Sequence, residues 1–352
     1  MAADILKDCR QLSTYISLTP EEQAWFARKE GAAPSPPCGV SSYYLSLIDN
    51  PDDPDDPIRR QCIPTVKECE VKSWDLEDPL GEDDVGAAPR LLHRYHDRAL
   101  FLSTDRCWMY CRHCFRRRFT AQGNASAGID EMYQAAEYLK EHTEIRELLI
   151  SGGDPLTMSV DRLEEMLQIF RGVRPSLVLR ICTRAPVVYP QGITERLIGM
   201  LSRNKPLYVV TQYNHPRECT GESLSASTAC INRGMPVLNQ TVLLRGINDH
   251  EDILEELFTT LTASGIVPYY LFQGDLAQGT SHFRVPLKRS IALAWNLTRR
   301  LSGISMPILA VDLPGGGGKV RLLEQQPEVK CADAWGYRSR EGALYWYPLE
   351  SS

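Results

Sequence analysis

Short apolar runs alternate with amphipathic segments along most of the chain from residue 99 onward. The apolar runs are rich in Val, Ile and Leu, as in buried strands, and lie at residues 99–103, 147–151, 177–182, 207–211, 237–244, 267–272 and 308–312. Segments with helical spacing lie between them, at residues 129–142, 160–170, 194–202, 223–233, 251–263 and 287–301. This alternation predicts parallel strands with helical crossovers. The number of units favours an α/β fold of the partial (β/α)6-type TIM barrel over a flat sheet.

The pattern differs before residue 98. There the sequence predicts an α-rich arm, in which Thr19 and Pro20, followed by two glutamates, mark a helix start. Residues 49–57 interleave aspartate with proline and predict a turn-rich, solvated loop. We therefore expect three parts: the arm (1–98), the barrel (99–320) and a short C-terminal extension (321–352).

Composition narrows the function classes. The chain has 352 residues, 43% of them hydrophobic, and a formal net charge of −6. This supports a folded core and argues against a nucleic-acid partner held by bulk charge. No apolar run approaches the roughly 18 residues that span a bilayer, and the first residues lack the apolar core of a signal peptide. We therefore expect a cytoplasmic protein without a membrane partner, in which most cysteines are free thiols.

Residues suited to chemistry follow the ends of the expected strands, where barrel enzymes carry their active sites. Cys107 follows the first strand, Gly152 and Gly153 the second, Thr183 and Arg184 the third, and Gln212 the fourth.

Cys107, Cys111 and Cys114 stand at C-x3-C-x2-C spacing. Thiolates hold [4Fe–4S] clusters, and a set of three would leave the fourth iron open to a small molecule. The amino and carboxylate groups of S-adenosylmethionine suit such an open iron. An odd number of cysteines in a reducing compartment disfavours disulfides, and the position of His113 between the cysteines disfavours zinc. The spacing therefore predicts a cluster on three cysteines.

A second signal is the run Asp312-Leu313-Pro314 followed by four glycines and Lys319. The glycines let backbone pass close to a ligand, and the lysine can serve as a phosphate clamp or a Schiff-base amine. A nucleotide P-loop fits badly, because Leu313 and Val320 stand where that motif needs Gly and Ser or Thr. A surface loop is the alternative. A Schiff-base lysine would need burial or neighbouring cations to depress its pKa.

Together these motifs resemble the lysine 2,3-aminomutase family of radical S-adenosylmethionine enzymes, which use pyridoxal 5′-phosphate. The similarity runs from residues 43–49 through His93-Arg94-Tyr95, the cysteine motif and Ser151-Gly152-Gly153-Asp154 to the lysine loop, and it covers most of the chain. The resemblance implies roles for thirteen residues: Cys107, Cys111 and Cys114 for the cluster; Gly152, Gly153, Asp154 and Gln240 for S-adenosylmethionine; Lys319, Arg94 and Arg98 for pyridoxal 5′-phosphate; and Arg116, Asp275 and Asp312 for the substrate. Arg116 would bind the substrate α-carboxylate, and the two aspartates its distal cation.

The resemblance implies an isomerase that moves the α-amino group of a cationic amino acid to C3, with L-lysine as the first choice and L-arginine as the next. L-glutamate is disfavoured as a substrate, because Asp275 and Asp312 would repel its side-chain carboxylate. A protein lysine, as in a related short-tailed branch, stays open as a substrate. So does radical oxidation or desaturation of a basic amino acid with the same cofactors. A non-enzymatic sensor is disfavoured, because substrate-holding aspartates would have no use beside Lys319.

Some positions depart from the family pattern. Trp108 and Phe115 stand where the lysine enzymes have Ser and Thr, and Gln212 replaces a histidine near the adenine. His250 replaces a zinc-binding cysteine and the chain ends soon after the lysine loop, so we expect no structural zinc. The remaining expectations are an electron donor such as flavodoxin or ferredoxin, and a homo-oligomer.

Overall fold

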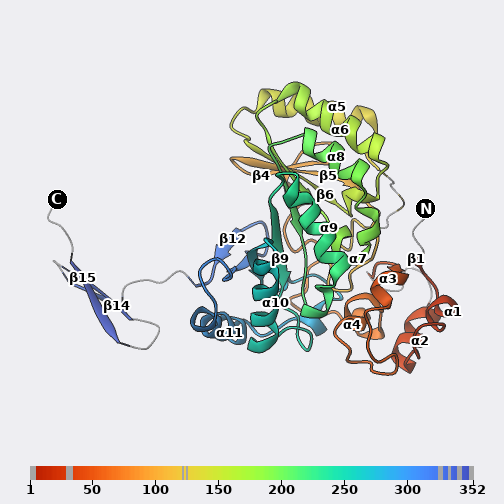
Figure 1. Cartoon of the computed structure of the whole chain (residues 1–352), viewed down its shortest axis with the longest axis vertical. Coiled ribbons are helices and arrows are strands. Elements are labelled where there is room, and N and C mark those ends of the chain that lie inside the picture. Colours follow the sequence, from red (N-terminus) through yellow and green to blue (C-terminus); the bar gives the residue numbers. More distant parts are fainter. Residues whose placement is uncertain are drawn as a thin grey trace.

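A single large sheet organises the molecule. The computed structural model describes residues 5–28, 35–120, 123, 126–323, 328–331, 334–338 and 343–348. Across these residues the main sheet has the strand order β12-β11-β10-β9-β8-β7-β6-β5-β4-β3 (Figure 1). Its parallel part consists of β5 (Arg98–Thr104), β6 (Glu147–Gly152), β7 (Val178–Cys182), β8 (Leu207–Thr211), β9 (Val237–Val242), β10 (Val267–Phe272) and β11 (Ile308–Leu313). Each of these strands pairs with the next along the chain, as crossover units require.

Helices follow the first six parallel strands and cover one face of the sheet (Figure 1). They are α5 (Ile129–Glu141), α6 (Val160–Val173), α8 (Glu195–Arg203), α9 (Gly221–Asn232), α10 (Glu251–Ala263) and α11 (Leu287–Arg300), with the four-residue α7 (Ala185–Val188) before α8. Hydroxyl groups of Ser159, Thr194 and Thr220 cap α6, α8 and α9 by accepting backbone N–H groups. The described chain therefore contains six strand–helix units and a seventh parallel strand, which confirms the expected partial barrel.

Strand register separates two faces. Phe101, Ile150, Ile181 and Val209 form a paired row across β5–β8 and are buried within the hydrophobic core that includes the helices. The alternate residues, such as Leu100, Leu149 and Arg180, line a cavity on the other face. The sheet therefore holds a core on one side and a binding space on the other.

Antiparallel strands extend the sheet at both edges. At one edge lies a hairpin of β3 (Gly86–Ala88) and β4 (Leu91–Tyr95), and at the other lies β12 (Gly318–Arg321). The sequence patterns did not predict these strands. In particular, Lys319 lies on a strand, where it pairs in register with Asp312.

The arm packs beside α7 (Figure 1), and its Tyr43 hydroxyl contacts the hydroxyl of Thr220, the residue that caps α9. It contains β1 (Ile5–Leu6), α1 (Cys9–Leu12), α2 (Pro20–Ala27), β2 (Val40–Ser41), α3 (Ser42–Leu45) and α4 (Arg59–Cys62). Thr19 caps α2 as expected. The prediction of a solvated loop at residues 49–57 is wrong at Asp56, which is buried and paired with Arg217 at 2.7 Å.

The C-terminal strands β13 (Val329–Lys330), β14 (Ala334–Arg338) and β15 (Leu344–Pro348) form a separate antiparallel sheet (Figure 1). None of the helices in the described residues is long and apolar enough to cross a lipid bilayer.

Candidate active site

One cavity of about 650 Å³ brings the predicted site residues together. It extends from the loop after β5 to the edge strand β12, and its volume is in the range of small-molecule sites. All thirteen residues that the sequence singled out line it: Arg94, Arg98, Cys107, Cys111, Cys114, Arg116, Gly152, Gly153, Asp154, Gln240, Asp275, Asp312 and Lys319. Residues far apart in the sequence therefore meet in one space.

The three cysteines lie at one end of the cavity as free thiols. Burial raises the pKa of Cys107 well above its usual value and raises that of Cys114 to about 11. Half-buried thiols with raised pKa values ionise when a cation or a metal stabilises the thiolate, and a thiolate-bound cluster meets that need. The donor set thus fits an iron–sulfur cluster.

A buried carboxylate from the arm anchors the cysteine loop. Arg112 donates to both oxygens of Glu68, at 2.7 and 2.6 Å, and Arg117 donates to Oε2 at 2.9 Å. Burial opposes ionisation of Glu68, but the two guanidinium groups outweigh it and lower its pKa to about 2. Because Arg112 and Arg117 lie on either side of Cys114 in the sequence, Glu68 fixes the backbone around that cysteine.

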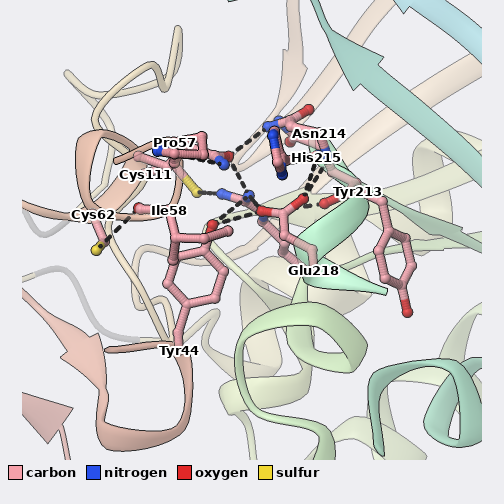
Figure 2. Close-up of polar contacts among 12 residues, drawn as sticks. Tyr44, Pro57, Ile58, Cys62, Cys111, Tyr213, Asn214, His215 and Glu218 are labelled. Carbon is pink, nitrogen blue, oxygen red and sulfur yellow. Dashed lines mark hydrogen bonds and ion pairs between the residues drawn. The ribbon is translucent and has the colours of Figure 1, made fainter. Parts of the chain in front are cut away.

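Arg184 reaches the cluster loop from the end of β7. Its Nη1 donates to Cys111 Sγ at 2.9 Å, and its Nη2 donates to Gln61 and Glu218, both at 2.6 Å. Figure 2 shows Tyr44, Asn214 and His215 gathered around Glu218 beside Cys111. The Tyr44 hydroxyl and the backbone N–H groups of Asn214 and His215 all donate to that carboxylate. The sequence placed Arg184 at a strand end but predicted none of these partners.

The Gly152–Asp154 turn after β6 packs directly against the cysteine loop. A Cβ atom on Gly153 would lie 2.3 Å from the Arg106 carbonyl oxygen, so only glycine permits this approach. The backbone N–H of Asp154 donates to the same carbonyl at 2.7 Å. The Asp154 carboxylate accepts from the Thr183 hydroxyl at 2.7 Å and the Arg184 N–H at 2.9 Å. This turn therefore ties the loops after β5, β6 and β7 together as well as lining the cavity.

Lys319 marks the other end of the cavity. Its Nζ contacts Asp312 Oδ2 at 2.5 Å and lies 4.0 Å from the centre of the Phe272 ring. Burial lowers the pKa of Lys319, although Asp312 opposes the shift. Burial and the charge of Asp312 raise the pKa of Asp275 to about 7. A half-buried amine with a depressed pKa fits a lysine that reacts with an aldehyde cofactor.

Cationic side chains stand near Lys319. Arg94 donates to the Leu80 carbonyl, and Arg98 lies over the Tyr95 ring at 4.0 Å and pairs with Asp97 at 2.8 Å. Both arginines line the cavity, together with Arg321. This concentration of positive charge suits a phosphate group.

Arg116 has a partner that the sequence did not reveal. Its Nε and Nη2 donate to the two oxygens of Glu82, at 3.1 and 2.6 Å, and its Nη1 reaches Ser151 Oγ at 3.3 Å. Its guanidinium group also lies 4.7 Å from the centre of the Phe115 ring. A carboxylate bound at Arg116 would therefore have to use the remaining N–H groups or compete with Glu82.

Comparisons with known proteins agree with this geometry. Residues 97–183 match the model of a 4Fe-4S single cluster domain. The chain is 40% identical to L-lysine 2,3-aminomutase of Clostridium subterminale over 342 residues, which covers 97% of this chain and 81% of that protein. It is also 40% identical to L-lysine 2,3-aminomutase of Bacillus subtilis, covering 96% of this chain and 71% of that protein. Glutamate 2,3-aminomutase of Clostridioides difficile is 37% identical, with 96% and 79% covered.

Among solved structures, a radical SAM methyltransferase from Sphaerobacter thermophilus matches with a TM-score of 0.47 and 16% identity, covering 63% of this chain and 68% of that one. The family of this chain follows from the aminomutases above, which match over nearly all of its length. The chain belongs to the lysine 2,3-aminomutase family of radical S-adenosylmethionine enzymes, whose cofactors are a [4Fe–4S] cluster, S-adenosylmethionine and pyridoxal 5′-phosphate.

Proposed function

We propose that this enzyme is a 2,3-aminomutase that moves the α-amino group of a cationic amino acid to C3, with L-lysine as the first candidate and L-arginine as the second. The observation that carries this proposal is the pair Asp275 and Asp312 in the same cavity as the three cysteines and Lys319. Two carboxylates suit a distal cation and repel a distal carboxylate. The family includes both lysine and glutamate enzymes, so the aspartates carry the choice between them.

The proposed roles follow from position. Cys107, Cys111 and Cys114 would hold the cluster, and Gly152–Asp154 with Gln240 would face S-adenosylmethionine. Lys319 would hold pyridoxal 5′-phosphate, whose phosphate Arg94 and Arg98 would bind. When bound, the cluster and S-adenosylmethionine would supply a carbon radical that removes hydrogen, and pyridoxal 5′-phosphate would supply a conjugated carbon that holds the migrating nitrogen and shares the unpaired electron.

Asp312 has two competing partners in this scheme. In the structure it pairs with Lys319 at 2.5 Å, so a substrate cation can use it fully only when the lysine amine turns away. Asp275 is half-buried in the same cavity, and burial and the charge of Asp312 raise its pKa to about 7, so part of the population is neutral near pH 7. An incoming cation would favour the ionised form. We therefore infer that substrate binding releases a proton from Asp275.

The decisive experiment is an anaerobic incubation of the enzyme with reductant, S-adenosylmethionine, pyridoxal 5′-phosphate and single amino acids. The proposal expects a β-amino acid from L-lysine or L-arginine with S-adenosylmethionine recovered, and no product from L-glutamate. Stoichiometric 5′-deoxyadenosine with an oxidised or unsaturated product would overturn the mutase assignment. Turnover of a lysine-bearing protein alone would overturn the small-molecule substrate.

Asp312→Asn serves as the matched variant. It should weaken turnover of the cationic substrate much more than cofactor binding, which is measured by the visible absorbance of the bound pyridoxal group. Unchanged turnover would contradict a role for Asp312 in holding a distal cation. The external one-electron donor, such as flavodoxin or ferredoxin, and the homo-oligomer stay predictions beside this proposal.

A further inference from the structure

A group of metal-binding side chains lies outside the cavity, at the end of the barrel where the parallel strands begin. His93 is on β4, and His142 and Glu144 are in the loop between α5 and β6. One ligand atom from each residue lies within 4.8 Å of the other two. These residues are not among those lining the active-site cavity, so the family chemistry does not account for them.

His93 presents a buried nitrogen without a partner. Its Nδ1 lies 2.9 Å from the Tyr138 hydroxyl, whereas its Nε2 is inaccessible to solvent and has no hydrogen-bond partner among the described residues. An unpaired buried polar atom is costly, and such an atom in a native structure calls for an explanation. The tyrosine hydroxyl can accept the Nδ1 hydrogen, which leaves the Nε2 lone pair free for a ligand. This is the arrangement in which an outer partner orients a metal-binding histidine.

His142 and Glu144 are solvent-accessible members of this group of three residues. The His142 ring stacks on Tyr138 at 3.9 Å and meets the His93 ring at 5.8 Å between centres. Its Nδ1 lies 2.8 Å from Glu144 Oε1. The two side chains are 37% and 32% exposed, so an ion can reach them from solvent. Tyr138 thus contacts both imidazoles and fixes their relative position.

The loop that carries these two ligands is held rigidly. Arg174, at the C-terminus of α6, donates to four of its neighbouring carbonyl groups, those of Leu139, His142, Thr143 and Ile145, at 3.0–3.2 Å. The backbone N–H of His142 also donates to the Tyr138 carbonyl at 3.0 Å. The backbone that carries the two ligands is therefore fixed by contacts that do not depend on a bound ion, while the side chains of His142 and Glu144 stay half-exposed.

We propose that His93, His142 and Glu144 form a binding site for a divalent transition-metal ion of the zinc class, with water as the fourth ligand. Two imidazoles and one carboxylate favour zinc and similar ions over calcium or magnesium, which prefer all-oxygen ligands. Ligand atoms around a tetrahedral zinc stand about 3.4 Å apart, from bonds of about 2.0–2.1 Å. Rotation of the two half-exposed side chains closes the present spacing. The bound ion links β4 to the α5–β6 loop.

The test uses the complete enzyme with its cluster in place, so that the cysteines are occupied. Zn²⁺ alone is titrated by calorimetry into the wild type and into His142→Asn and Glu144→Gln. Both substitutions are at half-exposed positions and should leave the fold intact. We expect one strong Zn²⁺ equivalent in the wild type and binding at least about tenfold weaker in each variant. His96→Asn, an exposed histidine three residues from His93, is the matched control and should bind as the wild type does.

X-ray absorption at the zinc edge provides a second readout. Nitrogen and oxygen neighbours with imidazole scattering support the site, whereas sulfur neighbours would assign the ion to cysteines and overturn it. Equal affinity in the wild type, His142→Asn and Glu144→Gln would also overturn the proposal. The result is independent of the mutase assignment, because neither measurement involves turnover.

Discussion

The two ends of the cavity are built in different ways. At the cluster end, Glu68, Gln61 and Glu218 come from segments far from the cysteines in the sequence, and they hold the loop through buried arginines. At the lysine end, Lys319 depends on its strand partner Asp312 and on the Phe272 ring from the adjacent part of the sheet. The cluster end is thus held by a network of buried ion pairs, whereas the Lys319 amine makes one half-buried ion pair, with Asp312 seven residues away. Substitutions at the cluster end should lower the free energy of unfolding, whereas substitutions at the lysine end should lower turnover without changing stability.

The largest functional effect should come from Lys319→Ala. Without the amine, no covalent attachment of pyridoxal 5′-phosphate is available, so the visible absorbance of the bound cofactor should vanish and turnover should fall below detection. Cluster iron and the free energy of unfolding should stay near wild-type values, because Lys319 makes one half-buried ion pair and takes no part in the buried network at the cysteines. Lys330→Ala, on β13, is the control. Persisting protein-bound imine absorbance in Lys319→Ala would refute the assignment of this lysine.

The largest structural effect should come from Glu68→Gln. It leaves Arg112 and Arg117 buried without a counter-charge, which should reduce the free energy of unfolding by about 3–5 kcal/mol and lower the iron content. Denaturant titration and iron analysis measure both. Glu70→Gln removes only an exposed partner of Lys72 and should leave the free energy of unfolding near the wild-type value.

The Glu68 carboxylate should also make the free energy of unfolding depend on pH. The folded pKa of Glu68, about 2, is below its ordinary value of 4.5, so its stabilising effect is complete above pH 4.5. That contribution is lost as the pH falls from 4.5 towards 2. Glu68→Gln should therefore flatten the stability curve in this window. An unchanged slope would mean that Glu68 is not the anchor described above.

The sequence predicted local features well and long-range ionic contacts poorly. Alternating apolar runs located β8 and α10 to the residue, because periodicity is a local property. The glycine run before Lys319 concealed strand β12, since glycine has low strand propensity and the pairing partner lies in β11. The cluster-end network had no local signal: Arg112 and Glu68 are 44 residues apart, and Arg184 and Glu218 are 34 apart. The sequence indicated this network only through Thr183 and Arg184, which follow the end of a predicted strand.

A smaller effect should appear in substrate binding at the lysine end. Because the pKa of Asp275 is raised to about 7, its ionised fraction falls as the pH drops below 7. Affinity for a cationic amino acid should therefore fall by up to about tenfold per pH unit below 7. Equilibrium binding of labelled L-lysine across this range measures it. Asp275→Asn should bind more weakly and lose the pH dependence, and a variant that kept the wild-type profile would exclude Asp275 as its source.

The smallest effect should be on the reduction potential of the cluster, which only changes at the cluster end should alter. Arg184 donates to Cys111 Sγ and carries a positive charge beside the cluster, so it should favour the reduced cluster. In Arg184→Gln, the reduced-to-oxidised ratio at a fixed potential should fall about tenfold, or about 59 mV for one electron. Arg184→Lys should retain part of the shift. EPR-monitored redox titration, normalised to iron content, measures it. Asp312→Asn should leave the potential unchanged, since Asp312 belongs to the lysine end. Equal shifts in Arg184→Gln and Asp312→Asn would show that the two ends are coupled, against the division drawn from their contacts.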